Sequence, residues 1–385
     1  PEAALPILSP GHKHHVSGGH QRHRVRNRCV DFRWPCSAAT LGVRAVCASA
    51  CMQTCVARFP WQIAPAHGAR HPSSTRAVKA GPVACFGEND ANQASVPKGL
   101  GYVIAVSAGY RHTCAVAVNQ SVVCFGDGSS GATRVPKGLG PVASVSAGGR
   151  HSCAVDVAGK LWCWGQGASV PAGVGRVVSV SAGNSHTCVL AENSSAICWG
   201  SNSTSVAGVG VGGGGGVRAA AVVAGNGSTC LVTPERTAAC WGHNADGTDR
   251  LGAGEVPNDL ASVAQIGTPG NNANCALTYS GTARCWGWLR FYEGFEGLRS
   301  VAAVAVGDNF MCALMASGAL RCFGGAQAPV RAAVPQELAA PGAALAVSAG
   351  PRYACVVKAP RKQDDRSRGT DRPRGRWVAA MLLLG

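Results

Sequence analysis

Cysteine is the residue with the clearest chemical pattern in this sequence of 385 residues, which contains 19 of them. A thiol can form a disulfide, bind a metal or serve as a nucleophile, and spacing helps to distinguish these roles. In six pairs the second cysteine follows the first by ten residues. The pairs are Cys114–Cys124, Cys153–Cys163, Cys188–Cys198, Cys230–Cys240, Cys275–Cys285 and Cys312–Cys322. A spacing that recurs in this way predicts a structural unit that is itself repeated along the chain.

The residues around each cysteine pair repeat as well. A glycine lies five residues before the first cysteine, and an aromatic residue followed by glycine comes directly after the second. The repeat glycines are Gly109, Gly148, Gly183, Gly225, Gly270 and Gly307. We expect them to serve the backbone, either through left-handed dihedral angles or through close approach of two chains. The period of roughly 35–45 residues is typical of propeller blades.

Two incomplete units lie at the ends of the repeated region. Residues 346–357 contain Gly350 and Cys355 but no second cysteine, whereas residues 81–87 contain Cys85 followed by Phe-Gly without a first half. Each end supplies what the other lacks. The sequence therefore predicts a seven-bladed ring, a composite closing blade with strands from both ends, and a Cys85–Cys355 disulfide.

The spacing inside a unit predicts a β-hairpin that brings its two cysteines together. A three-residue turn at 316–318 places Cys312 opposite Cys322, with Gly318 in the left-handed position. Opposed Cα atoms lie ~4.5–5.5 Å apart, within the ~4.4–6.8 Å range of disulfides. The alternative is that the cysteines are small buried hydrophobic residues. We favour disulfides because only a cross-strand pair requires cysteine at both positions.

A fourth, shorter strand is expected in each blade, at the Val-Pro linkers 96–97, 135–136 and 170–171. Proline suits an edge strand because it has no N–H group to donate to a neighbour.

The formal net charge of +16 lies mostly outside the repeated region. Residues 1–79 carry 11 Lys/Arg and 2 Asp/Glu, and residues 358–385 carry 8 and 3, whereas residues 80–357 carry 16 and 14. Binding to nucleic acid is therefore not expected for the propeller, although the basic ends could contact nucleic acid or phospholipid. No apolar stretch of ~18 residues predicts a membrane span.

We divide the chain into three parts. Residues 1–79 form a basic leader or tail of low order containing His, Pro and Cys, residues 80–357 form the propeller, and residues 358–385 form a basic disordered tail. The first part contains Cys51 and Cys55 near histidines, which allows a zinc site, but no second pair has matching spacing. Since the sequence begins with Pro1, we expect a fragment, a processed product or an imperfect gene model.

Other chemistry is sparse. The sequence has no phosphate-binding loop, nucleophile elbow or kinase motif, so we expect no enzyme, no catalytic residue, no cofactor and no metal. His112, His151 and His186 recur at one repeat position and could form a metal-binding ring on a surface, but repetition of the unit is the simpler cause. Four Asn-x-Ser/Thr sequences are candidates for glycosylation, at Asn119, Asn193, Asn202 and Asn226.

The repeated pattern is Val-Ser-Ala-Gly-x-x-His-Thr/Ser-Cys-Ala-Val, then Cys-Trp-Gly, then Val-Pro-x-Gly-Leu. Over about residues 80–357 it resembles the regulator-of-chromosome-condensation repeat family, which implies an all-β, seven-bladed β-propeller. That family includes nuclear exchange factors for a small GTPase, a secreted bacterial β-lactamase inhibitor and ectodomains of Crinkly-type plant receptor kinases. The paired-cysteine version looks closest to the secreted and receptor members. The sequence departs from the pattern where other residues replace the histidine, namely Ser228, Ala273, Phe310 and Tyr353.

The function we expect is a non-enzymatic protein-binding scaffold, secreted or part of a receptor ectodomain, and monomeric. Cysteine pairs in register favour an oxidising compartment, because cytosolic thiols stay reduced. One alternative is a nuclear or cytoplasmic guanine-nucleotide exchange factor or chromatin adaptor for a small GTPase. Another is the ectodomain fragment of a receptor-like serine/threonine kinase. Binding is expected on the variable loops Ser201–Gly216 and His243–Asn258.

Overall fold

The computed structural model describes residues 79–200, 217–242, 256–267, 273–287, 295, 297–324 and 334–360. The chain divides into two units, Pro1–Arg70 and His71–Gly385, and all described residues belong to the second. The predictions for residues 1–78 and 361–385 therefore lie outside the described residues. Within them, no helix has the length and apolar character needed to cross a membrane.

The fold is all-β, as predicted, and its strands form seven antiparallel sheets among the described residues. Three sheets come from the first part of the ring: β2 (Val103–Ala108), β3 (His112–Ala117) and β4 (Val122–Gly126); β5 (Val142–Ala147), β6 (His151–Asp156) and β7 (Leu161–Gly165); β8 (Val177–Ala182), β9 (His186–Ala191), β10 (Ser195–Gly200) and β11 (Val217–Arg218). Three more follow: β12 (Ala221–Ala224), β13 (Ser228–Val232) and β14 (Ala238–Gly242); β15 (Val263–Ile266), β16 (Ala273–Thr278) and β17 (Ala283–Gly287); β18 (Val301–Val306), β19 (Phe310–Met315) and β20 (Leu320–Gly324).

The closing sheet joins the two ends of the repeated region, as the half-units predict. Strand β1 (Val83–Gly87) pairs with β22 (Tyr353–Lys358), which also pairs with β21 (Ala344–Ala349). The register places Cys85 opposite Cys355. A 3-10 helix, η3 (Gln336–Ala339), precedes this sheet.

The predicted fourth strand at the Val-Pro linkers is wrong. Residues 96–97, 135–136 and 170–171 are not in strands, and the fourth strand that the described residues do contain is β11, which pairs with β10. The linkers form turns instead, in which Leu100 N–H donates to Pro97 O and Leu139 N–H donates to Pro136 O. Proline starts such a turn readily because its φ is fixed near the required value.

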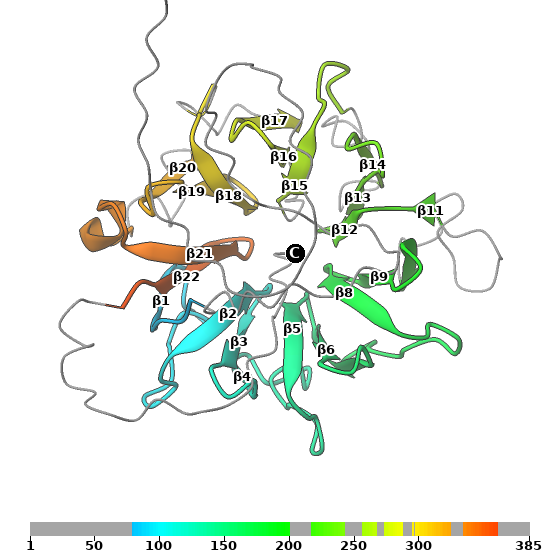
Figure 1. Ribbon diagram of the computed structural model, residues 1–385. Coiled ribbons are helices and arrows are strands. Elements are labelled where there is room, and N and C mark those ends of the chain that lie inside the picture. The colour runs from blue at the N-terminus through cyan, green and yellow to red at the C-terminus, as the bar shows by residue number, and fades with distance from the viewer. Residues whose placement is uncertain are drawn as a thin grey trace, which may run out of the picture. The chain divides into compact units, whose positions relative to one another are not determined.

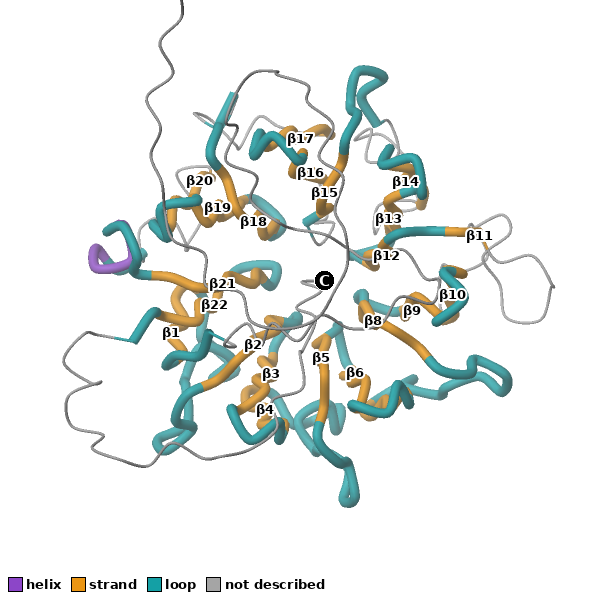
Figure 2. The backbone as a smooth tube through the Cα atoms, viewed as in Figure 1, coloured by secondary structure: helices purple, strands orange, loops and turns teal. Residues whose placement is uncertain are grey.

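The sheets follow one another around a closed circuit (Figure 1). Strand β2 lies beside β5, β5 beside β8, β8 beside β12, β13 beside β15, β15 beside β18, and β18 beside β21, which in turn lies beside β2. Figure 2 shows the same order around a centre, with the strands separated by loops. The seven-blade count stays a prediction, since parts of the repeated region lie outside the described residues.

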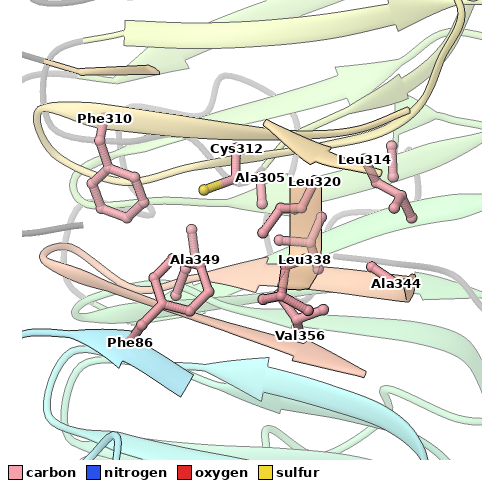
Figure 3. Close-up of a cluster of buried hydrophobic side chains, with 13 residues drawn as sticks. Phe86, Ala305, Phe310, Cys312, Leu314, Leu320, Leu338, Ala344, Ala349 and Val356 are labelled. Atoms are coloured by element: carbon pink, nitrogen blue, oxygen red, sulfur yellow. The ribbon is translucent and has the colours of Figure 1, made fainter. Parts of the chain in front are cut away.

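Apolar side chains fill the joints, by which we mean the contacts between consecutive sheets. Between the β18–β20 sheet and the closing sheet, Phe310, Leu338 and Phe86 are buried together (Figure 3). Phe86 is one of the aromatic residues that follow a second cysteine, and Trp164 and Trp286 at the equivalent position are also buried. Burying a large apolar side chain stabilises a fold by about 1.5–3 kcal/mol. These aromatic residues therefore hold neighbouring sheets together.

The turn between the two cysteines contains one left-handed residue in six units. Glycine occupies this position at Gly159, Gly281 and Gly318, with φ of 80°, 76° and 80°. Other residues hold the same conformation in the remaining units, where φ is 66° at Gln120, 66° at Ser194 and 65° at Arg236. Left-handed backbone is unfavourable for residues with a Cβ atom, so the surrounding hairpin must impose it.

A candidate binding site at the centre of the ring

Disulfides fix the second and third strands of every sheet. Seven disulfides pair all fourteen cysteines of the described residues, with Cα–Cα distances of 4.0–4.1 Å. They are Cys85–Cys355, Cys114–Cys124, Cys153–Cys163, Cys188–Cys198, Cys230–Cys240, Cys275–Cys285 and Cys312–Cys322. Each disulfide joins two neighbouring strands of one sheet.

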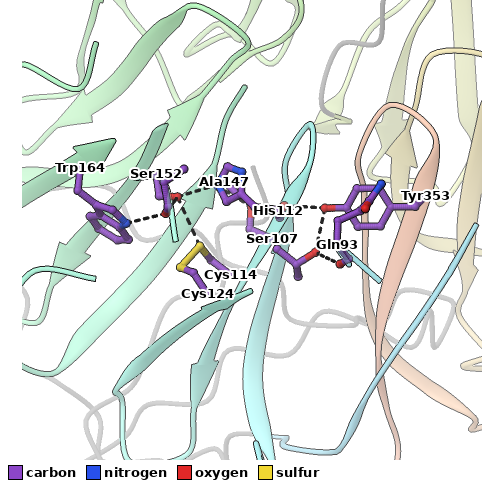
Figure 4. The surroundings of a disulfide bond; sticks show 11 residues. Gln93, Ser107, His112, Cys114, Cys124, Ala147, Ser152, Trp164 and Tyr353 are labelled. Carbon is purple, nitrogen blue, oxygen red and sulfur yellow. Dashed lines mark hydrogen bonds between the residues drawn. A yellow bond between two sulfur atoms is a disulfide. The ribbon is translucent and has the colours of Figure 1, made fainter. Parts of the chain in front are cut away.

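The repeated histidines point into the joints, so the alternative of a histidine ring on a surface is wrong. His112, His151 and His186 are only 1%, 4% and 3% exposed. Their Nε2 atoms lie 2.8, 2.8 and 2.9 Å from hydroxyl groups of the next unit, and Figure 4 shows the first of these contacts. The hydroxyls belong to Ser152, Thr187 and Thr229, each of which directly precedes a first cysteine.

Burial keeps these histidines neutral at ordinary pH. Desolvation is the main reason that the pKa of His112 and that of His186 are lowered to about 4, and repulsion from His151, when it is protonated, contributes to both shifts. Burial also lowers the pKa of His151. A neutral imidazole can form the observed bond with a hydroxyl group without placing a charge inside the protein.

Tyr353 takes the place of histidine in the closing sheet and keeps the joint polar. Its hydroxyl donates to His112 O at 2.6 Å and lies 2.8 Å from Thr113 Oγ1. Thr113 Oγ1 in turn donates to Gln93 O at 2.8 Å. Complete burial raises the pKa of the Tyr353 phenol. The tyrosine thus remains a neutral donor that closes the ring between β22 and β3.

A second polar contact crosses four joints near the centre. The hydroxyls of Ser107, Ser146 and Ser181 accept hydrogen bonds at 2.9 Å from the N–H groups of Ala147, Ala182 and Ala224. Ser348 Oγ accepts in the same way from Ala108 N–H at 3.0 Å. These are the serines of the Ser-Ala-Gly motif, so each one fixes the Ala-Gly turn of the next unit.

The Ala-Gly turns surround a hollow at the centre of the ring. It is lined by Ala108, Gly109, Tyr110, Ala147, Gly148, Gly149, Ala182, Gly183, Asn184, Ala224, Gly225, Asn226, Val306, Gly307, Asp308, Ala349, Gly350 and Pro351. A Cβ atom on Gly109, Gly148 or Gly183 would lie only 2.5 Å from the carbonyl oxygen of the glycine in the next unit. These glycines therefore serve close approach of the backbones, the second of the two roles expected for them.

The residue after each of these glycines sets the chemistry of the rim. Tyr110 is 44% exposed, and Asn184 Nδ2 donates to Asn226 Oδ1 at 2.8 Å. Gly149 belongs to the turn between those of Tyr110 and Asn184 and has no side chain. Asp308 and Pro351 complete the described part of the rim. An aromatic ring, amide groups and exposed backbone can bind another molecule. Among the described residues of the rim we find no nucleophile beside a general base.

Arginine lies one residue further along in three of these turns, at Arg111, Arg150 and Arg352. Arg111 contacts Asp90 at 3.1 Å and Asp127 at 3.5 Å, and Arg352 contacts Glu88 at 2.9 Å. The hydrogen bond from Gln93, followed by the Arg111 charge, lowers the pKa of Asp90. Arg150 is exposed and has no ion pair with the residues that the structure describes.

The other predicted sites separate in space. Asn119 and Asn193 are exposed in the hairpin turns between paired cysteines, whereas Asn226 lies on the central rim. Asn202, Gly270 and the loop Ser201–Gly216 lie outside the described residues, as does His243–Asn258 up to its last three residues. The variable-loop prediction therefore stays untested. No group of three or more potential metal ligands occurs in the described part of the chain.

Sequence reasoning missed the hydroxyl groups that cross the joints. Ser107, Thr187 and their equivalents lie in strands that were predicted from their apolar residues and cysteines alone. The available signal was that a serine or threonine recurs at two fixed positions of a strand predicted to be buried, where an unpaired hydroxyl would be costly. A repeat that has to pair its hydroxyls can do so with the neighbouring repeat.

A ring of disulfide-stapled antiparallel sheets, held by polar joints around a central hollow, defines the protein as a β-propeller. Four segments match the model of the regulator of chromosome condensation (RCC1) repeat: residues 103–132, 142–169, 177–204 and 301–326. The chain thus carries RCC1 repeats, as predicted. Among curated proteins, no sequence matches it significantly.

Solved structures share the fold. Yeast RCC1 (Prp20) bound to Kap60 is similar with a TM-score of 0.61 and 14% identity, covering 79% of this chain and 98% of that chain. The Prp20p structure from Saccharomyces cerevisiae, whose description names binding to Gsp1p and histones, gives 0.59 and 13% over 76% and 94%. The CRINKLY ectodomain of the Arabidopsis thaliana receptor kinase ACR4 gives 0.51 and 23% over 63% and 86%.

Proposed function

We propose that this chain is a non-enzymatic, protein-binding propeller that works outside the cytosol, as a secreted protein or as a receptor ectodomain. The propeller spans residues 80–357, and the basic residues 1–79 and 358–385 flank it. The binding surface is the central rim, formed by the turns after β2, β5, β8, β12, β18 and β21. Binding there requires no catalytic group and no cofactor.

The observation that carries this proposal is the complete pairing of cysteines. All fourteen cysteines in the described residues are in disulfides, one in each sheet. Such bridges persist in oxidising compartments and are rare in the cytosol and nucleus. The similarity to the ACR4 ectodomain supports the same compartment, and the binding of Kap60 by Prp20 supports protein binding on this fold.

The alternative is an intracellular exchange factor or adaptor, and the RCC1 repeats of the chain favour it. It requires free thiols and a small GTPase as partner. The near balance of charge over residues 80–357, with 16 Lys/Arg against 14 Asp/Glu, gives it no additional support as a chromatin binder.

Peptide mapping without reduction tests the compartment. Protein taken from its natural source is treated with a thiol-blocking reagent, digested and analysed by mass spectrometry. We expect Cys85–Cys355 and the six pairs ten residues apart to be recovered as disulfides. Recovery of these cysteines as blocked free thiols would overturn the extracytosolic proposal and favour the exchange factor, which a nucleotide-release assay on a small GTPase then tests directly.

Glycosylation is a second readout of the same compartment. We propose that Asn119 and Asn193 carry glycans, because both are exposed and lie away from the rim in turns. Asn226 is held by Asn184 on the rim and is the least accessible described candidate. Removal of glycans with an endoglycosidase, followed by intact-mass measurement, shows how many sites are occupied.

A further inference from the structure

Three arginines stand at the same place in three neighbouring turns of the ring. Arg352, Arg111 and Arg150 each follow the rim residue of their unit and precede the residue that crosses the joint. Two of them are neutralised within the protein, Arg352 by Glu88 and Arg111 by Asp90 and Asp127. The third is exposed and without such an acid among the described residues.

The loss of the acids follows from two substitutions between units. The loops after Gly87 and Gly126 are equivalent, because Thr113 Oγ1 donates to Gln93 O and Ser152 Oγ donates to Ala132 O in the same way. In that alignment Ser129 replaces Asp90. The residue after the third-strand glycine is Asp127 beside Arg111 but Gln166 beside Arg150. Both carboxylates that hold Arg111 are therefore neutral residues beside Arg150.

The rim position before Arg150 carries no side chain of its own. Gly149 occupies it, and a Cβ atom at that position would collide with Asn184, so a side chain there is excluded. Tyr110 precedes this position on the rim and is 44% exposed, and its N–H donates to Gly148 O at 3.0 Å. The rim here is therefore formed by the Tyr110 ring, the Gly149 backbone and the Asn184 amide, and exposed Arg150 follows Gly149 in the chain. We call these residues, Tyr110, Gly149, Arg150 and Asn184, the rim notch.

We propose that the rim notch binds an acidic segment of a partner protein, whose carboxylate pairs with Arg150 in the place that Asp90 and Asp127 occupy around Arg111. This inference rests on the proposed protein-binding function and names the chemistry of the partner. Arginine matches a carboxylate through two parallel hydrogen bonds, and tyrosine and arginine are enriched among residues that dominate protein interfaces. The Asn184 side-chain amide donates one proton to Asn226 Oδ1 and has a second for the partner's backbone.

The charges favour a protein partner over a nucleic acid. Arg111 and Arg352 are already paired, and Asp308 lies on the same rim, so among the described residues of these turns Arg150 is the one arginine without an ion pair. A polyanion is bound by many cations at once, which releases counterions and gives affinity. A single arginine beside a tyrosine instead suits one carboxylate in a specific position.

Selection of random linear peptides displayed on phage, with the intact full chain as bait, tests the proposal. We expect the selected peptides to share an aspartate or glutamate at one position. Synthetic copies labelled with fluorescein are then titrated against the wild-type chain and its variants by fluorescence anisotropy. Arg150→Glu should weaken binding by about tenfold or more, and a peptide with lysine in place of the shared acid should recover binding to that variant.

Two variants control for charge and for folding. Arg176→Glu makes the same charge change at an exposed arginine that is paired with Glu192 and lies before β8, at the opposite end of that strand from the rim. It should leave peptide binding unchanged. Arg150→Gln keeps much of the side-chain size and should weaken binding, while retaining the wild-type thermal transition because Arg150 is exposed.

The possible failures are distinguishable. Peptides that bind the rim but lack an acid, or that bind Arg150→Glu as well as wild type, would overturn the acidic partner and leave the protein-binding function intact. If no peptide is enriched above a control without bait, the result would count against both the acidic partner and the protein-binding function. Binding of a labelled oligothymidylate that Arg150→Glu abolishes, without acidic peptides being selected, would replace the protein partner with a nucleic acid.

Discussion

The ring consists of two arcs that close their joints by different means. The first arc comprises the closing sheet and the sheets β2–β4, β5–β7 and β8–β10, and the second comprises β12–β14, β15–β17 and β18–β20. In the first arc a buried His or Tyr reaches a hydroxyl group of the next unit. The serine contact to the next Ala-Gly turn starts from the same four sheets.

The second arc replaces these polar contacts with matched apolar volumes at two of its joints. At the histidine position it has Ala273 and Phe310, and at the hydroxyl position of the following unit it has Met311 and Ala354. A small residue thus faces a large one in each of these two joints, and the members of each pair belong to the same buried cluster. At the joint before them the two positions are held by the buried polar residues Ser228 and Asn274. The comparison teaches that one joint geometry accepts either a hydrogen bond or a complementary pair of side chains, as long as the space is filled.

The largest expected loss of stability comes from removing the disulfide that closes the ring, and it should exceed the loss from removing a disulfide within one hairpin. Replacing both Cys85 and Cys355 with serine removes a crosslink between residues 270 apart, which in the chain-entropy model costs about 5–6 kcal/mol. Replacing Cys275 and Cys285, which are 10 apart in the second arc, should cost about 2–3 kcal/mol. Chemical denaturation followed by tryptophan fluorescence measures both. Equal losses would show that the sheet pairing of β1 with β22 closes the ring without help from its disulfide.

Acid should destabilise the first arc more than the second. Burial lowers the pKa of His112 and of His186 from 6.5 to about 4, so the unfolded chain binds these protons first. Stability is therefore full above pH 6.5 and falls as the pH decreases toward 4, by about 2–3 kcal/mol for each of the two. Thermal unfolding from pH 7.5 to 4 measures the loss, and His112→Gln with His186→Gln should flatten its dependence on pH. An unchanged slope in that double variant would assign the acid sensitivity to carboxylates.

Removing a hydroxyl group from a joint of the first arc should destabilise the protein more than replacing one apolar side chain with another in a joint of the second arc. Thr187→Val leaves the buried Nε2 of His151 without its partner and should destabilise the protein by about 1–3 kcal/mol. Met311→Leu keeps the volume beside the Cys275–Cys285 disulfide and should cost less than about 1.5 kcal/mol. Urea denaturation of the two variants at pH 7.5 compares them. The reverse order would mean that the apolar joints are the stricter ones.

The smallest expected effect concerns the left-handed residue of the hairpin turn, which occurs in both arcs. Arg236→Gly should stabilise the protein by about 0.5–1 kcal/mol, because φ of 65° is unfavourable for arginine and open to glycine. Gly318 holds the equivalent position in the turn between β19 and β20, with φ of 80°. Gly318→Ala should destabilise the protein by a similar or larger amount. Differential scanning calorimetry detects both shifts. A loss of stability in Arg236→Gly would show that the contact of Arg236 with Tyr279 outweighs the strain.

Much of the architecture was predictable because the relevant contacts are local in the sequence. The ten-residue spacing and a three-residue turn place Cys312 opposite Cys322, and the register of the two strands follows without knowledge of any other unit. The half-units at 81–87 and 346–357 predicted the closing sheet for the same reason, since each carries a recognisable part of one pattern. The prediction of a strand at the Val-Pro linkers was wrong because both an edge strand and a turn accept proline.

The central site depended on contacts between units, and those were not predictable. His151 and Thr187 lie 36 residues apart, and His186 and Thr229 lie 43 apart, so their pairing depends on how one sheet is placed against the next. The same placement decides that Arg111 meets Asp90 of the preceding loop while Arg150 has no such acid in the described residues. By itself the sequence determined the repeated hairpin, its disulfides and the closing sheet, because hairpin register is local. The tertiary structure alone decided which polar groups cross the joints and which arginine remains available on the rim, because those contacts exist only once the sheets are packed in a ring.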